Sequence, residues 1–182
     1  TNMYKNIIVQ DNIKKLENYG MEVIKPDSGY LACGDIGEGK MPSAAVLFDY
    51  ILKELQCEKD LAGKNVLITA GPTIEKIDKV RFISNPSSGK MGYEIARAAM
   101  LRGASVTLIS GKTSLTPPPF VKFINVLSAE DMFEAVKENY KMADIIVKSA
   151  AVADYRPSNP LDYKVKKSDG ELFIELERTE DI

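Results

Sequence analysis

A run of small and hydroxyl-bearing residues, Ser84 to Gly92 (SNPSSGKMG), stands directly before a predicted helix over residues 91–102. Exposed N–H groups and the dipole at the start of a helix favour an anion such as phosphate. Arg81 is close enough in sequence to add positive charge. The run is not a Walker loop, because Ser84 and Met91 stand where that motif requires Gly and Ser or Thr. An ordinary helix capped by Ser or Asn is the equally weighted alternative.

A second group of residues, Ala150 to Pro157 (AAVADYRP), follows a predicted strand. Small residues at a strand end allow a flat ligand to lie against the backbone. Asp154 has a carboxylate that could accept hydrogen bonds from a ribose or help to hold Mg²⁺ through water. The alternative is a tight exit from the strand with a surface aspartate.

Three lysines, Lys164, Lys166 and Lys167, lie within four residues. Their charges suit a triphosphate, whose own charge must be neutralised for displacement at phosphorus. A solvated basic turn is the commoner explanation for such a cluster. Cys33 lies in a glycine-rich loop over residues 27–41, where a thiol could donate a proton. Most lone cysteines are buried small hydrophobic residues, and Cys57 fits that description better.

Strands and helices alternate from residue 65 onward, in the order typical of a parallel α/β sheet with flanking helices. The carboxyl ends of parallel strands meet at one edge of the sheet, where ligands bind. The residues at these ends are Gly71-Pro72-Thr73, Ser110-Gly111 and Ser149-Ala150-Ala151. The predicted strands are 65–70, 105–109, 121–126 and 144–148, and the predicted helices are 91–102 and 129–141.

The first 56 residues have a different pattern from the rest. It predicts a helix over residues 3–19, a short strand over 21–24, the loop over 27–41 and a helix over 44–56. The polar segment 57–64 is interpreted as a linker. Near the other end of the chain, alternation over residues 172–177 predicts a last strand.

Composition excludes several classes of protein. A net charge of −2 does not fit a basic nucleic-acid surface. No apolar run reaches the roughly 18 residues that span a bilayer, and two cysteines form no disulfide framework, so a cytoplasmic protein is expected. Histidine is absent, so proton transfer within this chain must use Cys, Lys, Tyr, Asp or Glu.

Taken together, these segments resemble the bifunctional phosphopantothenoylcysteine synthetase/decarboxylase family. The most specific match is the run at 60–92, DLAGKNVLITAGPTIEKIDKVRFISNPSSGKMG, followed by KSAAVADYRP at 148–157 and KVKK at 164–167. SGYLACGDIGEGKM at 28–41 resembles the substrate-recognition flap of the decarboxylase half. The resemblance implies a remnant of a flavodoxin-like decarboxylase domain over 1–56, the linker 57–64, and the Rossmann-like first part of the ligase domain over 65–182.

The resemblance also implies a reaction and its participants. CTP with Mg²⁺ would activate the carboxylate of 4'-phosphopantothenate as an acyl-cytidylate, releasing pyrophosphate, and the amine of cysteine would then displace CMP. A carboxylate is a poor acyl donor, and this chemistry needs anion clamps more than a histidine base. The implied nucleotide site is Gly71, Ser149, Ala150, Ala151, Asp154 and Lys164. The implied substrate site is Arg81, Asn85, Ser87, Ser88 and Gly89.

Three residues are implied in catalysis: Asn85 and Lys164 in the ligase step, and Cys33 as proton donor in the decarboxylase step. The flavin FMN of that second step would bind mostly to residues that precede this chain. We therefore expect the chain to be part of a longer enzyme, incomplete for either activity alone. The whole enzyme would be a homo-oligomer.

Two rival functions remain open. An NAD(P)-dependent reductase would use the same sheet, and Tyr163 and Lys167 form a Y-x-x-x-K pair. That pair lies in a loop, however, and no G-x-G-x-x-G run follows the strand over 65–70. The second rival is a non-catalytic regulatory subunit. The presence of Asn85, Asp154 and Lys164 together argues against it.

Overall fold

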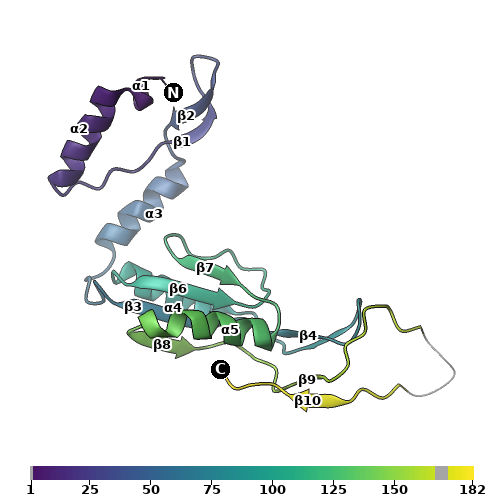
Figure 1. The fold of residues 1–182 in the computed structure, drawn as a ribbon. Helices are drawn as coiled ribbons and strands as arrows, with labels where there is room; N and C mark the ends of the chain where they lie inside the picture. Colours follow the sequence, from purple (N-terminus) through teal and green to yellow (C-terminus); the bar gives the residue numbers. More distant parts are fainter. Residues whose placement is uncertain (1, 167–171) are drawn as a thin grey trace. The chain divides into compact units, whose positions relative to one another are not determined.

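The computed structural model describes residues 2–166 and 172–182 (Figure 1). The chain divides into two compact units, Thr1–Ile51 and Leu52–Ile182. The second unit holds the parallel sheet and most of the predicted site residues. None of the helices in the described part of the chain is long and apolar enough to cross a bilayer.

Two helices of the first unit, α1 (Asn2–Lys5) and α2 (Ile7–Asn18), replace the single helix predicted over residues 3–19. The break is at Asn6, whose side chain accepts a hydrogen bond from the Ile8 N–H at 2.9 Å and so starts a new helix. Helix α3 (Ala44–Leu55) agrees with the helix predicted over 44–56.

A hairpin of β1 (Asp27–Tyr30) and β2 (Ile36–Lys40) occupies the segment predicted as a loop over 27–41. The predicted strand over 21–24 was also wrong, because no regular element covers these residues. The glycines mark a strand turn rather than an irregular loop. Gly34 has a φ of +89°, and its N–H donates to the Leu31 carbonyl at 2.9 Å.

Four strands of the described chain form the parallel sheet of the second unit, in the order β7-β6-β3-β8. They are β3 (Asn65–Ala70), β6 (Ser105–Ser110), β7 (Lys122–Asn125) and β8 (Ile145–Lys148), which confirms the four predicted strands and the α/β class. Strand β3 is buried from its second residue onward, since it has a neighbour on each side and a helix on each face.

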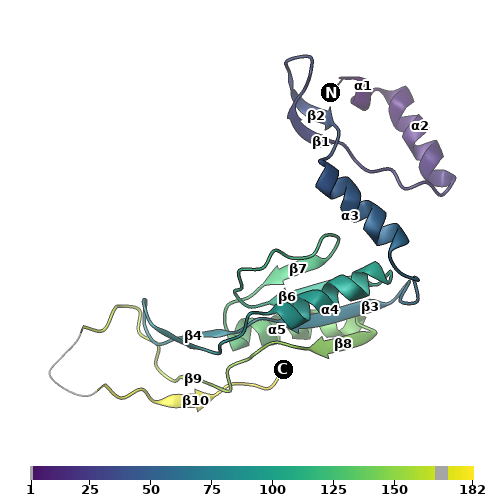
Figure 2. The same cartoon turned by 180° about the vertical axis from the view of Figure 1, so that it is seen from behind.

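Helices α4 (Lys90–Leu101) and α5 (Ala129–Asn139) cover opposite faces of the sheet, as Figures 1 and 2 show from the two sides. Alternate residues of β3 divide between them. Ile68 joins the core cluster that contains Ala96 of α4, whereas Leu67 joins the cluster that contains Met132 of α5. A 3-10 turn, η1 (Tyr140–Met142), follows α5.

Two small antiparallel pairs extend from the carboxyl edge of the sheet. One joins β4 (Ile74–Lys76) to β5 (Phe82–Ser84) in a segment that was not predicted as strand. The other joins β9 (Tyr155–Pro157) to β10 (Leu176–Arg178). The strand predicted over 172–177 was therefore mostly wrong. Leu176 is paired with Pro157 at the end of the regular ladder, and one further bond follows, from the Ser158 N–H to the Glu175 carbonyl at 3.1 Å.

Candidate active site

The strand order of the sheet reverses between β3 and β8, because β6 and β7 lie on one side of β3 and β8 lies on the other. Such a point is where open α/β sheets bind ligands, beyond the carboxyl ends of the strands. Beyond both strands, the Ala151 N–H donates to the Gly71 carbonyl at 2.8 Å, and the Thr73 N–H donates to the Ala151 carbonyl at 3.3 Å. The two strand ends thus form one continuous edge.

Ser149 and Ala150 are held in this edge by a buried hydroxyl. Thr69 Oγ1 accepts hydrogen bonds from the N–H groups of Ser149 at 3.3 Å and Ala150 at 3.4 Å. Thr69 itself is only 2% exposed. The backbone after β8 is therefore fixed against β3, with only small side chains beside it. This arrangement leaves room for a flat ligand.

Asn85 connects the two predicted motifs. Its side-chain amide donates to the carbonyl of Val152 at 3.0 Å and to that of Ala151 at 3.3 Å. Ser84, one residue earlier, donates from its hydroxyl to the Thr73 carbonyl at 2.7 Å. The segment before α4 is therefore attached to the residues that follow β8.

The turn over residues 87–89 supplies side chains for the first N–H groups of α4. The Gly89 N–H donates to Ser87 Oγ at 3.3 Å, and the Lys90 N–H donates to Ser88 Oγ at 3.4 Å. Both bonds are long, so these hydroxyls are weakly held. Gly89 occupies the N-cap position with a φ of +74° and no side-chain cap. An anion placed here meets the positive end of the helix dipole.

Three glycines make close contacts at this helix start. A Cβ on Gly89 would lie 2.7 Å from the Thr113 methyl and 3.3 Å from the Gly71 Cα. A Cβ on Gly92 would lie 2.5 Å from the Ala70 Cβ. The dinucleotide fingerprint is absent as a continuous run, yet these glycines occupy comparable places. Gly71 lies in the turn after β3, Gly89 at the start of α4, and Gly92 at a close contact between α4 and β3. The β4–β5 hairpin is inserted between the first and the second.

Asp154 lies on the exposed side of the same edge. The residue before it, Ala153, donates its N–H to Thr73 Oγ1 at 2.9 Å, and the Asp154 carbonyl accepts from the Thr179 N–H at 3.0 Å. Asp154 lines a hollow of about 330 Å³ together with Thr69 and Ala150. Its carboxylate is thus available beside the predicted nucleotide residues.

Arg81 and the lysine segment lie elsewhere, at the tip of the β4–β5 hairpin. The Arg81 guanidinium donates to Asp78 Oδ2 from Nε at 2.9 Å, and its Nη2 donates to the Val165 carbonyl at 3.1 Å. Lys164 is adjacent to Val165 and exposed. The chain between Arg81 and Asn85 spans roughly 13 Å at strand geometry, so the backbone beside Lys164, held at Arg81, is separated from the Asn85 turn. Lys167 lies outside the described residues.

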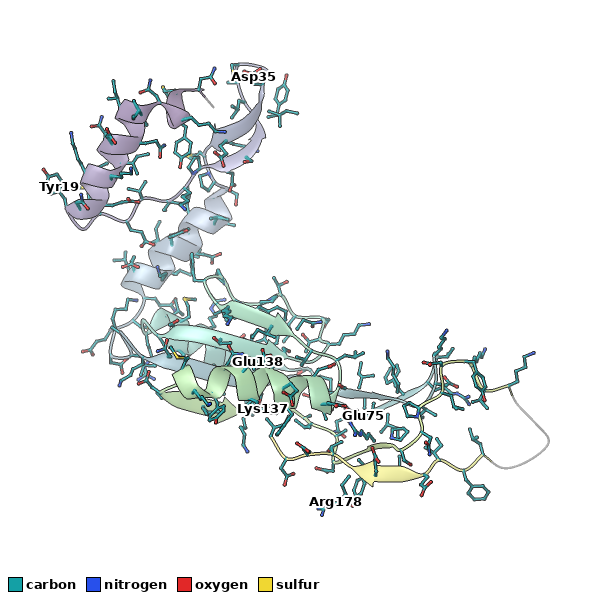
Figure 3. The ribbon with its side chains drawn as sticks, in the orientation of Figure 1. Tyr19, Asp35, Glu75, Lys137, Glu138 and Arg178 are labelled. Atoms are coloured by element: carbon teal, nitrogen blue, oxygen red, sulfur yellow. The ribbon has the colours of Figure 1, made fainter. Side chains whose placement is uncertain are left out.

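The residues that hold the hairpin in place have little signal in the local sequence. Glu75 is 4% exposed and its Oε1 accepts the Ala129 N–H at 2.9 Å, at the first turn of α5 (Figure 3). Thr73 and Asp78 are also buried, and each accepts hydrogen bonds from residues at least 80 positions later. A polar segment without periodicity concealed all three.

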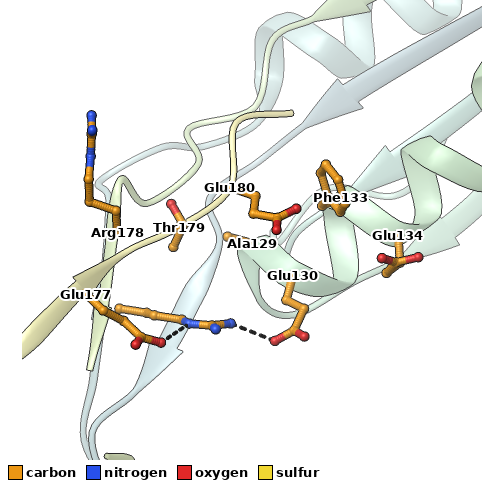
Figure 4. Close-up of a pocket in the computed structure, with 9 residues that line it drawn as sticks. Ala129, Glu130, Phe133, Glu134, Glu177, Arg178, Thr179 and Glu180 are labelled. Atoms are coloured by element: carbon orange, nitrogen blue, oxygen red, sulfur yellow. Dashed lines mark hydrogen bonds and ion pairs between the residues drawn. The ribbon is translucent and has the colours of Figure 1, made fainter. Parts of the chain in front are cut away.

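A separate cavity of about 260 Å³ lies between α5 and β10 (Figure 4). Arg156 spans it, donating to Glu130 at 2.7 Å and to Glu177 at 2.8 Å. Both glutamates raise the pKa of Arg156, and the hydrogen bond that Arg156 donates to Glu177 contributes most. Glu134 and Glu180 also line the cavity. The lining therefore carries four glutamates and two arginines, Arg156 and Arg178, and Arg156 is already paired.

The described residues contain no cluster of three or more His, Cys, Asp or Glu side chains suited to a metal ion. Mg²⁺ commonly binds proteins through one or two carboxylates together with substrate phosphates. Asp154 fits that pattern as an exposed carboxylate beside the hollow, which the exposed Glu180 and Asp181 also line.

Cys33 lies between the two strands of the first-unit hairpin and is exposed. Its thiol is 3.8 Å from Asp35 Oδ2. Tyr30 begins the same turn, and a Cβ on Gly34 would lie 4.0 Å from the Tyr30 hydroxyl. The thiol is thus presented on a short structured turn, open to a ligand.

Comparison with protein families now adds to this geometry. The family model "DNA/pantothenate metabolism flavoprotein C-terminal domain" matches residues 61–182, and the model "Flavoprotein" matches residues 1–56. The chain belongs to the DNA/pantothenate metabolism flavoprotein family.

Two similar proteins of this family are each named coenzyme A biosynthesis bifunctional protein CoaBC. The one from Haemophilus influenzae is 47% identical over 99% of this chain and 45% of its own length. The one from Bacillus subtilis is 48% identical, with the same two coverages. A crystal structure of the C-terminal domain of CoaBC is 54% identical, with a TM-score of 0.58 over 66% of this chain and 56% of that chain.

The chain therefore spans less than half the length of these curated relatives. The family confirms the resemblance seen in the sequence motifs, and it does not favour the reductase or the regulatory subunit. A match to a flavoprotein model over residues 1–56 is in keeping with a flavin as the cofactor of that half.

Proposed function

We propose that residues 65–182 form part of a ligase site that joins cysteine to 4'-phosphopantothenate with CTP, in a coenzyme A biosynthesis enzyme. The observation that carries the proposal is the Asn85 amide, which attaches the turn before α4 to the carbonyls of Ala151 and Val152. The predicted anion turn and the predicted nucleotide edge thereby become one surface. The naming of the relatives supports the same pathway.

The reaction has two balanced steps. The 4'-phosphopantothenate carboxylate attacks the α-phosphorus of CTP, forming an acyl-cytidylate and releasing pyrophosphate. The cysteine amine then attacks the acyl carbon, CMP leaves, and the amine loses a proton. Both steps build negative charge at phosphate or carbonyl oxygens, which positioned N–H groups and cations stabilise.

Different residues have different roles in these two steps. Ser87, Ser88 and Gly89, at the start of α4, hold a phosphate or the acyl intermediate together with Asn85. The edge from Ser149 to Ala151 and Gly71 lies under the nucleotide. Asp154 accepts from the ribose or orients Mg²⁺, which would neutralise the triphosphate.

Lys164 would bind the triphosphate and assist the aminolysis, and Arg81 would add positive charge for the substrate. Arg81 is already paired with Asp78, so its contribution would come from the exposed part of its guanidinium; the side chain is 43% exposed. In the first unit, Cys33 would donate the proton of the decarboxylase step, whose redox chemistry FMN would supply.

Calorimetric titration of the full-length enzyme tests the nucleotide assignment. CTP with Mg²⁺ is expected to bind, and NADPH at the same concentrations is not. Preferential binding of NADPH would end the ligase proposal. Release of pyrophosphate from CTP, dependent on 4'-phosphopantothenate and measured in a single turnover without cysteine, tests the first step directly.

A further inference from the structure

Asp78 is the most heavily hydrogen-bonded side chain at the tip of the β4–β5 hairpin. Its Oδ1 accepts the N–H groups of Val80 and Arg81, each at 2.7 Å. Its Oδ2 accepts from the Arg81 guanidinium, at 2.9 Å from Nε and 2.5 Å from Nη2. The side chain is completely buried. One carboxylate therefore shapes the loop between the two strands.

The same pair also binds a distant segment of the chain. The Val165 N–H donates to Asp78 Oδ2 at 3.2 Å, and the Val165 carbonyl accepts from Arg81 Nη2 at 3.1 Å. The N–H and the carbonyl of Val165 are thus both hydrogen-bonded to the Asp78–Arg81 ion pair. A further bond, from the Leu161 N–H to the Ile77 carbonyl at 3.0 Å, fixes the start of the segment.

We call this contact, in which Asp78 and Arg81 bind the backbone of Val165, the clamp. It determines how the neighbouring lysines are presented. Lys164 and Lys166 are exposed, whereas Val165 between them is partly buried. Alternate residues of an extended segment point to the same side. With Val165 attached to the hairpin, Lys164 and Lys166 share the outer side, and the register of the segment is fixed to within one residue.

The clamp stays charged in the pH range of a living cell. The Arg81 guanidinium, with the N–H groups of Arg81 and Val80, holds the pKa of Asp78 well below its usual range. Loss of either partner would leave a buried charge or buried N–H groups uncompensated, which is costly. Breaking the pair should therefore release Val165 from the hairpin.

We propose that Asp78 is a positioning residue for Lys164: through its pairing with Arg81 it holds the backbone of Val165, so that Lys164 meets the triphosphate in a defined register. The proposal rests on the proposed function of Lys164. It assigns to Asp78 no contact with substrate.

Kinetics of the full-length enzyme test the coupling. Asp78→Asn keeps the shape of the side chain but replaces the acceptor of Arg81 and Val165 by a donor. The KM for CTP is expected to rise about tenfold. Lys164→Gln is expected to impair ligation more than Asp78→Asn does. The double variant Asp78→Asn/Lys164→Gln is expected to be no more impaired than Lys164→Gln alone, because the effects of residues that act as a unit are not additive. Losses that multiply in the double variant would overturn the proposal.

The matched control is Asp162→Asn, which removes the same charge from an exposed position in the same segment. Its KM for CTP is expected to stay within twofold of wild type. Val165→Pro removes the N–H donated to Asp78 and also restricts the backbone of residues 164 and 165, but it leaves the bonds of Asp78 to Val80 and Arg81 intact. Val165→Pro replaces Asp78→Asn in the test if Asp78→Asn fails to fold. It is expected to raise the KM for CTP in the same way. An unchanged KM in Val165→Pro would contradict the clamp.

Limited proteolysis separates the clamp from the function. Trypsin is expected to cleave after Lys164 about tenfold faster in Asp78→Asn than in wild type or Asp162→Asn, with cleavage after the exposed Lys40 as internal reference. An unchanged rate after Lys164 would refute the clamp. Faster cleavage of Asp78→Asn, combined with normal ligation by Lys164→Gln, would instead support the clamp but refute the role of Lys164. The positioning proposal would then be refuted as well.

Discussion

Thr73 and Ala153 are 80 positions apart in the sequence, and the Ala153 N–H donates to Thr73 Oγ1 at 2.9 Å. Thr73 is completely buried. Its hydroxyl connects the segment that follows the central strand β3 to the residue before Asp154. The placement of Asp154 therefore depends on a side chain that itself cannot reach a ligand.

Thr73→Val tests this connection, since valine keeps the shape but lacks the acceptor. A buried N–H left without a partner costs about 1–3 kcal/mol, so the free energy of unfolding should fall by that amount. The KM of the full-length enzyme for CTP should rise several-fold, because Ala153 is no longer held. Thr73→Ser keeps the acceptor and should retain a near-normal KM. Equal KM values in the two variants would contradict the argument.

Asn85→Asp should impair amide formation by about 10- to 100-fold, which corresponds to losing two hydrogen bonds of about 1 kcal/mol each. A carboxylate cannot donate to the carbonyls of Ala151 and Val152 and is repelled by them. Because the same two bonds are present in the folded protein without ligands, the melting temperature should fall as well. Steady-state ligation assays and thermal unfolding of the full-length enzyme measure both.

The control for Asn85 is Asn12→Asp, which makes the same change of charge at an exposed position of α2. It should ligate at the wild-type rate. Wild-type ligation by Asn85→Asp would discredit the site as assigned.

Most of the sheet could be predicted because its signals are local. Strand β3 is buried on both faces and so appears as a largely apolar run, Val66 to Ala70, in which Thr69 is the polar residue. The hairpin of β4 and β5 was missed, because its strands have three residues each and one of them, β4, buries a charged residue, Glu75. Burial of a glutamate depends on the α5 N–H that it accepts, and that partner is 54 positions away.

The candidate site, like the fold, could be predicted only in part. Hydroxyls and glycines before a helix can be recognised from their spacing, so the turn at Ser87 and Ser88 was a prediction that local sequence could support. The position of Lys164 could not be predicted, because it is set by Asp78 and Arg81 through the backbone of Val165. The family resemblance assigned Lys164 to the nucleotide site without locating it, and the structure holds its neighbour Val165 at the hairpin tip.

Gly92→Ala should destabilise the fold by about 1–3 kcal/mol, the usual cost of overpacking a core. The added methyl would lie 2.5 Å from the Ala70 Cβ and 3.2 Å from the Thr69 carbonyl oxygen, so α4 must move away from β3. Denaturant unfolding measures the loss. Glu94→Ala, at an exposed position of the same helix, should stay within about 0.5 kcal/mol of wild type. A Gly92→Ala protein as stable as Glu94→Ala would show that the contact can relax.

Asp131 gives the fold a pH dependence whose sign can be derived. Its Oδ2 accepts the N–H groups of Ser128 at 3.0 Å and Leu127 at 3.2 Å, completing a capping box at the start of α5. These bonds, that from Ser128 most, hold the pKa of Asp131 below its ordinary value, against an opposing effect of burial. A carboxyl with a lowered pKa in the folded state stabilises the fold above its unfolded pKa of about 4, and this contribution is lost as the pH falls through the folded pKa.

Asp131→Ala should therefore lower the free energy of unfolding by about 1 kcal/mol at pH 7, the typical value of a helix cap. The difference between wild type and variant should shrink as the pH falls below 4, since wild type then loses the charged acceptor as well. Urea unfolding at pH 7, 4 and 3 measures it. Glu138→Ala, near the other end of α5, should not destabilise the fold, because a negative charge at a helix C-terminus is unfavourable. A difference for Asp131→Ala that stays constant down to pH 3 would mean that the neutral carboxyl caps the helix as well as the charged one.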